Sequence, residues 1–172
     1  MKKLAVFVTL CLIASAAAYF VYLSDELPEM TIEATGGRVV LVRDDKTITI
    51  DGTNSIRTGD FITTSDGGSA RLRLAGERRA FIGESARIVV TSESSLEGRS
   101  GRLRVNVAAP TEVLFSDVTA STSRAHFRVD VGVGAARVGS YRGDVALDAP
   151  GEPALRLRSL FEVQTAAGQL PG

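Results

Sequence analysis

The sequence predicts an all-β domain, and three observations lead to this prediction. Short runs in which apolar and polar residues alternate recur along the chain, as in SARLRLA at residues 69–75, and period two is the signature of a strand with one buried face. Glycine, proline and Asp-Gly pairs separate these runs at short intervals, as turns between strands require. No run after residue 35 has the period of an amphipathic helix. We therefore expect antiparallel-rich strands in a two-layer sandwich or solenoid-like coils, with a closed barrel as the competing architecture.

Residues 1–23 predict an N-terminal hydrophobic helix. Lys2 and Lys3 precede the uncharged apolar run 4–23, which as a helix would span about 30 Å, the thickness of the hydrocarbon layer. Acidic residues follow the run. This charge arrangement predicts an N-terminus in the cytoplasm and a domain on the far side of the inner membrane, in the periplasm.

The same segment also fits a secretory signal peptide. Small residues at 14–16 and 16–18 would allow cleavage, but the apolar run continues through residues 19–23 beyond both sites. We therefore expect an uncleaved single-pass anchor, with export to the periplasm after cleavage as the alternative. Cys11, the one cysteine, lies inside the run, so no disulfide is expected in the exported part.

The remainder divides into a tether over residues 24–35 and one β-domain over residues 36–170. The tether contains Pro28 and shows no sustained periodicity. In the β-domain, alternation or short apolar runs predict strands at 38–42, 47–50, 61–64, 69–75, 87–90, 102–108, 112–115, 126–131, 144–148, 154–158 and 160–163.

Composition and residue inventory argue against several classes of function. The 20 basic and 20 acidic residues cancel, which disfavours a nucleic-acid-binding protein. A hydrolytic triad would have to use His126, the only histidine, with Ser123 and Asp130. These residues lie in one strand region without a nucleophile elbow. Zinc and iron sites lack ligands. We therefore expect no enzyme activity, no catalytic residues, no metal and no cofactor.

The stretch GDFITTSDGGSARLRLAGERRAFIGES, residues 59–85, resembles the FecR domain family. That family's pattern runs Gly-Asp-x-Ile-x-Thr, then Gly-x-Ala-x-Leu-x-Leu, then a turn that closes with Gly and Ser. The resemblance extends more loosely over residues 36–170, with Ala125 at a position where glycine is usual. The residues that match the core pattern are Gly59, Asp60, Ile62, Thr64, Gly68, Ala70, Leu72, Leu74 and Gly83.

These motif residues are interpreted as determinants of the fold. The glycines stand where a reversing chain needs conformations that other residues resist, and the apolar positions share one strand face. The resemblance implies an extracytoplasmic β-domain. In the iron-transport regulators that give the family its name, this domain relays a signal from an outer-membrane receptor, and a cytoplasmic domain binds a sigma factor.

This chain has only residues 1–3 before the apolar run, so we expect no direct contact with a sigma factor. The expected function is a non-enzymatic interaction or sensory accessory module of the bacterial cell envelope. A structural or carbohydrate-binding envelope domain is the alternative.

Arginines on the polar faces of separate strands form a candidate binding face for an envelope protein or a glycan. Arg71 and Arg73 alternate with leucines in one predicted strand, and Arg102 and Arg104 alternate with apolar residues in another. They would form one basic face if the two strands lie close together, with a mixed surface of both charges as the plainer alternative. Arg156 and Arg158 repeat the pattern near the C-terminus.

Overall fold

The computed structural model describes residues 30–166 and residue 170 of the chain. These residues form sixteen strands, which confirms the all-β prediction. None of the described residues belongs to a helix long and apolar enough to cross a membrane. The predicted helix at residues 4–23 lies outside the described residues and stays a prediction.

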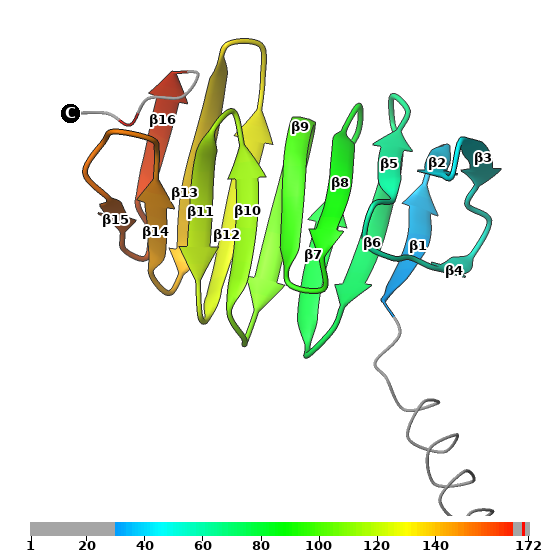
Figure 1. Ribbon diagram of the computed structural model, residues 1–172, viewed down its shortest axis with the longest axis horizontal. Coiled ribbons are helices and arrows are strands. Elements are labelled where there is room, and N and C mark those ends of the chain that lie inside the picture. The colour runs from blue at the N-terminus through cyan, green and yellow to red at the C-terminus, as the bar shows by residue number, and fades with distance from the viewer. Residues whose placement is uncertain (1–29, 167–169, 171–172) are drawn as a thin grey trace, which may run out of the picture.

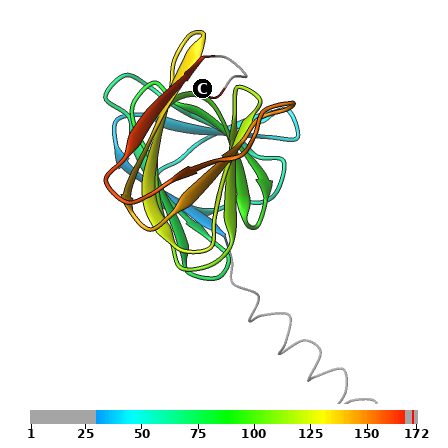
Figure 2. The same cartoon turned by 90° about the vertical axis from the view of Figure 1, so that its left-hand side faces the viewer.

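The sixteen strands form one mixed and mostly antiparallel sheet, which β9 (Ser95–Val107) divides into two layers, A and B. Layer A runs in the order β4-β1-β6-β7-β9-β12-β13-β16, and layer B in the order β3-β2-β5-β8-β9-β10-β11-β14-β15. Figure 1 shows layer B in front of layer A, and Figure 2 shows the two layers facing one another. The bounds in layer A are β1 Thr31–Gly36, β4 Thr53–Ser55, β6 Ser69–Leu74, β7 Arg78–Ile82, β12 Ala125–Val131, β13 Ala135–Arg142 and β16 Glu162–Ala166. Those in layer B are β2 Val39–Arg43, β3 Lys46–Thr49, β5 Phe61–Thr64, β8 Arg87–Ser92, β10 Thr111–Phe115, β11 Val118–Thr122, β14 Val145–Asp148 and β15 Leu155–Leu157.

Strand β9 belongs to both layers. Its first half pairs with β8 and, in the one parallel pairing among the described strands, with β10. Its second half pairs with β7 and β12 in layer A. Gly101 lies where the strand changes layers and has a φ of 86°, a conformation open mainly to glycine. A Cβ atom at this position would lie 2.5 Å from the Cα of Ala86, so the crossing requires glycine for space as well.

The core lies between the two layers and is built by the alternation seen in the sequence. The largest fully buried side chains include Leu72, Leu103 and Phe127 from layer A, and Leu41 and Ile62 from layer B. Burying a side chain of this size contributes roughly 1.5–3 kcal/mol. Packing of the two inner faces is therefore the main source of stability, as expected for a domain without disulfides.

The β-domain begins earlier than the sequence predicts. Strand β1 falls inside the segment expected to be a tether, and Met30 and Ile32 are buried in the core. The alternation in β1 is short and includes only one large apolar residue that is fully buried. It therefore gives a weak signal, although the strand pairs with both β4 and β6.

Four further strands, β4, β7, β11 and β13, are absent from the prediction. In three of them an inward position is occupied by a small residue, Ala80 in β7, Ala120 in β11 and Ala136 in β13. Small inward residues weaken the contrast between apolar and polar positions, so the period of two is hard to recognise.

One predicted strand starts too early. The apolar run 160–163 predicts an extended segment, but β16 begins at Glu162. Leu160 has a φ of 70°, which interrupts an extended backbone. The turn is held to β13 by two hydrogen bonds, Leu160 N to Ser140 O at 2.7 Å and Ser140 N to Phe161 O at 2.9 Å.

We predict that Gly101→Ala strongly destabilises the protein. The substitution combines a positive φ with overlap against the backbone of Ala86, and strain of this kind costs on the order of 1–3 kcal/mol. Gly52→Ala is the matched control, because Gly52 has a similar φ of 83° but a Cβ atom there would meet no other atom within 4 Å. Urea unfolding of both variants checks this. Equal losses of unfolding free energy would show that the crossing imposes no steric constraint of its own.

Candidate functional site

The FecR-like motif residues lie in β5, in β6, in the loops that flank β5 and, for Gly83, directly after β7. Asp60 is the charged residue of this set, and its side chain is 1% exposed. Its carboxylate accepts hydrogen bonds from Arg43 Nε at 2.8 Å, Arg43 Nη2 at 2.6 Å and the Arg57 amide at 2.8 Å. Burial alone would raise the pKa of Asp60, but these bonds hold it below its ordinary value. The carboxylate thereby joins β2 to the loop that precedes β5.

The remaining polar and glycine positions of the motif hold the turns next to β5. Thr64 Oγ1 donates to the Gly83 carbonyl at 2.7 Å and accepts from the Ala86 amide at 2.9 Å. At Gly68 a Cβ atom would lie 2.8 Å from the Arg38 carbonyl oxygen. Gly83 is less crowded, and Gly59 has a φ of 92°. The apolar motif residues Ile62, Ala70, Leu72 and Leu74 are all buried. The contacts of these residues are those of fold determinants.

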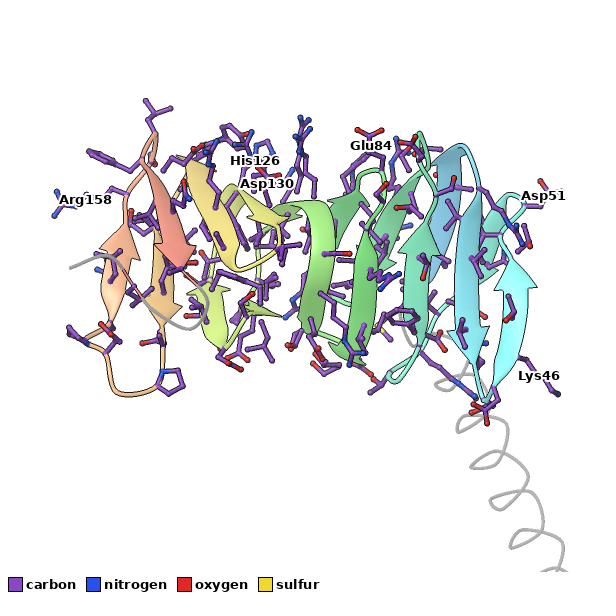
Figure 3. The ribbon with its side chains drawn as sticks, turned by 90° about the horizontal axis from the view of Figure 1, so that it is seen from above. Lys46, Asp51, Glu84, His126, Asp130 and Arg158 are labelled. Carbon is purple, nitrogen blue, oxygen red and sulfur yellow. The ribbon has the colours of Figure 1, made fainter. Side chains whose placement is uncertain are left out.

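The predicted arginines come together on the outward face of layer A. Strand β7 lies between β6 and β9 and pairs with both, so Arg71, Arg73, Arg102 and Arg104 point away from the core on the two strands that flank β7. Strand β7 adds Arg79 to the same face. We call these five residues the basic face. Figure 3 shows His126 and Asp130 of the neighbouring strand β12 on this side of the molecule.

Two outward residues at the centre of the basic face, Arg79 and Phe81, were not predicted from the sequence. Both lie in β7, where they alternate with the inward Ala80 and Ile82. This alternation in residues 78–82 was the available signal. Arg156 and Arg158 do not join the face, since β15 is at the edge of layer B and Arg158 lies at the end of the molecule.

Arginines at the rim of the basic face have carboxylate partners. Arg102 Nε lies 2.9 Å from Asp130 Oδ1, and Arg71 Nη1 lies 3.4 Å from Glu33 Oε2. Beyond β9, Glu162 contacts Arg128 at 3.1 Å. The Arg71–Glu33 pair is about half exposed and contributes little to stability, whereas Asp130 and Arg128 in the other two pairs are partly buried.

The central arginines differ from those at the rim. Within the described residues, Arg73, Arg79 and Arg104 have no carboxylate oxygen within 4 Å. Arg73 lies directly opposite Arg79 in the β6–β7 register, and Arg104 lies opposite Arg128 in the β9–β12 register. Like charges at directly opposite positions are unfavourable. The centre of the face therefore has positive charge that the described part of the chain leaves unneutralised.

A pocket of about 450 Å³ opens at this centre. We call it the Phe81 pocket; its lining residues are Arg71, Arg79, Phe81, Arg104, Val105, Asn106 and His126. Phe81 is 42% exposed, and the guanidinium of Arg71 lies over its ring at 5.2 Å from the centroid. A second hollow of about 380 Å³ adjoins it and shares Arg71 and Arg79. The surface thus combines guanidinium groups with an accessible aromatic ring.

His126 does not take part in a hydrolytic arrangement in the described residues. Its ring packs against Tyr141 with centroids 5.1 Å apart, while Asp130 contacts Arg102 and Arg128 at 2.9 Å each. Ser123 is exposed in the turn before β12. Over the described part of the chain, no group of three His, Cys, Asp or Glu residues is placed to hold a metal ion.

Comparisons with known proteins give similarity in fold. No protein-family model matches the chain, and no curated protein matches it. Two crystal structures of a putative anti-sigma factor from Parabacteroides distasonis ATCC 8503, at 1.65 Å and 2.50 Å resolution, superpose with TM-scores of 0.57 and 0.56 at 17% sequence identity. Each match covers 64% of this chain and 57% or 56% of the other chain. The similarity, consistent with a FecR-like domain, shows a shared fold over little more than half of that protein.

We predict that acid weakens the fold through Asp60. Because the pKa of Asp60 is lower in the folded chain than the ordinary value of about 3.9, its contribution is complete above that value and is lost as the pH falls through the folded pKa. Asp60→Asn should lower the unfolding free energy at pH 7 by roughly 3 kcal/mol, the cost of breaking a buried pair, and should remove this part of the acid dependence.

Urea unfolding between pH 7 and pH 2 measures both effects. Asp51→Asn, which changes an exposed aspartate, is the control and should behave like the wild type. A pH dependence that is the same in the wild type and in Asp60→Asn would contradict the assignment.

We also predict that Arg79→Gln stabilises the protein in the absence of a ligand. The substitution removes the repulsion between Arg79 and Arg73, a cross-strand effect of roughly 0.2–1 kcal/mol. The gain should shrink as salt is added, because salt screens exposed charges. Urea unfolding at low and high ionic strength checks this, with Arg87→Gln in layer B as the control. A loss of stability, or a gain that does not depend on salt, would count against repulsion at the centre of the face.

Proposed function

We propose that this chain is a non-enzymatic FecR-like interaction or sensory accessory module of the bacterial cell envelope, and that it binds its partner through the basic face. The proposal places the β-domain in the periplasm and attaches it to the inner membrane through residues 4–23. In this proposal the chain catalyses no reaction and binds no cofactor.

The fold supports a binding role. Two solved structures with a similar fold belong to a protein described as a putative anti-sigma factor, and an interaction role for this chain agrees with that description. Within residues 59–85, the residues that match the FecR pattern form turns and core in layers A and B. The residues between them, Arg71, Arg73 and Arg79 among others, lie on the outward face of layer A and are free for another use.

The observation that carries the proposal is the unneutralised centre of the basic face. Arg73, Arg79 and Arg104 are exposed and have no carboxylate partner among the described residues, although Glu33 and Asp130 lie at the rim of the same face. A positive surface of this kind attracts a negatively charged partner and increases the rate of encounter. Arginine and exposed aromatic rings are also the residues that contribute most at protein interfaces.

Direct binding of a sigma factor is not part of the proposed role. If the domain lies in the periplasm, a signal that reaches transcription requires a second protein with a cytoplasmic region. The proposed module would then act as an accessory to that protein.

The rival function is a structural or carbohydrate-binding envelope domain. The same arginines favour it, because guanidinium groups also bind the carboxylates and phosphates of acidic glycans. The two functions therefore differ in the chemical class of the partner and share the surface.

We predict that photo-crosslinking in cells identifies the partner from positions on the basic face. A crosslinking residue at Arg73 or Arg104 should give specific adducts with a receptor or a membrane regulator. The same residue at Arg87 or Glu112, which are exposed on the outward face of layer B, should give few. Mass spectrometry of the adducts makes the comparison.

The other outcomes are also informative. Adducts with glycan alone would favour the rival function. Recovery of a sigma factor with the full-length chain would contradict the proposed topology. Equal labelling from both layers would show that the basic face is not the interaction surface.

A further inference from the structure

The outward residues of the basic face form rows that run across strands β6, β7 and β9, and their spacing is regular. Along β6, Arg71 and Arg73 are two residues apart on the same face, a separation of about 6.7 Å in an extended strand. Across the strands, Phe81 lies directly between Arg71 of β6 and Arg104 of β9, at a strand spacing of about 4.8 Å. Arg79 belongs to the next row, opposite Arg73. The guanidinium groups thus originate from two rows, and the aromatic ring lies in the middle of one of them.

This geometry matches the side chains of an extended acidic segment. In an extended chain, residues at alternate positions face the same side and are also about 6.7 Å apart. Two carboxylates at positions i and i+2 could therefore each meet one row of arginines. Guanidinium groups bind carboxylates with paired, directional hydrogen bonds.

Polar and apolar groups beside the arginines fit a peptide as well. Asn106 lines the pocket opposite both Arg79 and His126, and its side-chain amide can both donate to and accept from a peptide backbone. Phe81 is 42% exposed although the guanidinium of Arg71 lies over its ring, 5.2 Å from the centroid, and it offers an apolar contact between the two flanking arginines. Tyr141, 42% exposed, lies beside His126 and extends the aromatic surface away from β7.

Among the described residues, no carboxylate pairs with the arginines at the centre of the face. Glu33, at the rim, contacts Arg71 at 3.4 Å while both side chains remain about half exposed. A pair this open is weak and can exchange for a better partner. The described part of the chain thus leaves Arg79 and Arg104 to an external anion.

We propose that the Phe81 pocket binds an extended acidic protein segment with carboxylates at alternate positions, with an apolar side chain of that segment resting on Phe81. This inference rests on the proposed interaction role of the basic face and names the chemistry of its partner. The carboxylates bind Arg79 and Arg104, and Arg71 turns from Glu33 toward the partner. Binding relieves the repulsion between Arg73 and Arg79, so the bound domain is more stable than the free one.

The test uses fluorescently labelled peptides and the purified full-length chain. One peptide carries three glutamates at alternate positions with a leucine nearby on the same side. A second peptide has the same composition, but its glutamates are three positions apart, so that successive glutamates face opposite sides of an extended chain. An oligomer of uronic acid is the third probe, and inorganic phosphate the fourth. Fluorescence polarisation at low salt gives the dissociation constants of the labelled probes, and competition gives that of phosphate.

The alternating peptide is expected to bind at least about tenfold more tightly than the respaced one, a difference equivalent to about 1.4 kcal/mol. Arg79→Gln and Arg104→Gln should each weaken its binding about tenfold or more. Phe81→Ala should weaken it less, and only when the peptide contains the leucine. The control Arg87→Gln should leave binding unchanged. Circular dichroism and thermal unfolding of each variant show whether it is folded.

Three results would overturn the inference in distinguishable ways. Equal binding of the two peptides would show that carboxylates at alternate positions are not required, but it would leave the proposed interaction role intact. Tighter binding of the uronic acid oligomer, dependent on Arg79 and Arg104, would identify a glycan and favour the rival function. Absence of binding by every probe, or binding that is unaffected by Arg79→Gln and Arg104→Gln, would refute two claims. It would show that the pocket does not bind an acidic segment and that the basic face is not a binding surface.

Discussion

The two layers share strand β9, which passes from layer B to layer A at Gly101. One strand pairs with β8 and β10 in layer B and with β7 and β12 in layer A, so it fixes the registers of both layers together. The crossing needs a residue with a positive φ and no side chain, because Gly101 packs against the backbone of Ala86. The two inner faces meet across the core because this strand links them.

The same strand determines which charges become neighbours. Its second half places Arg104 opposite Phe81 on one side and opposite Arg128 on the other. Arginine has two different roles in this domain as a result. Arg43 is bound to a buried carboxylate and stabilises the fold, whereas Arg79 and Arg104 are exposed and repelled by their cross-strand neighbours. Charge repulsion that the fold retains on an exposed surface favours a binding role, since an anionic partner can neutralise the arginines and relieve it.

The sequence predicts the fold class and part of the candidate site because both follow from alternation. In residues 69–75 and 102–108 large leucines and valines alternate with arginines, so the buried face and the basic face are equally clear. The strand between them is missed because Ala80 gives little apolar contrast, and Arg79 and Phe81 are missed with it. Strand β1 is hidden in the expected tether for a related reason, since only Ile32 marks its inward face strongly. The neighbour relation of β6, β7 and β9 depends on pairing over long sequence distances, which local periodicity does not contain.

We infer that the centre of the basic face attracts anions because Arg73, Arg79 and Arg104 have no carboxylate partner within the described part of the chain. The most direct measurement is a titration of the folded protein with inorganic phosphate, followed by NMR of the arginine Nε–Hε groups assigned by single substitutions. We expect saturable shifts concentrated at Arg73, Arg79 and Arg104, with little change at Arg43, which is already bound to Asp60, or at Arg87 in layer B. Shifts of similar size at Arg87 and at these three arginines, or shifts that do not saturate, would show that the centre of the basic face has no particular affinity for anions.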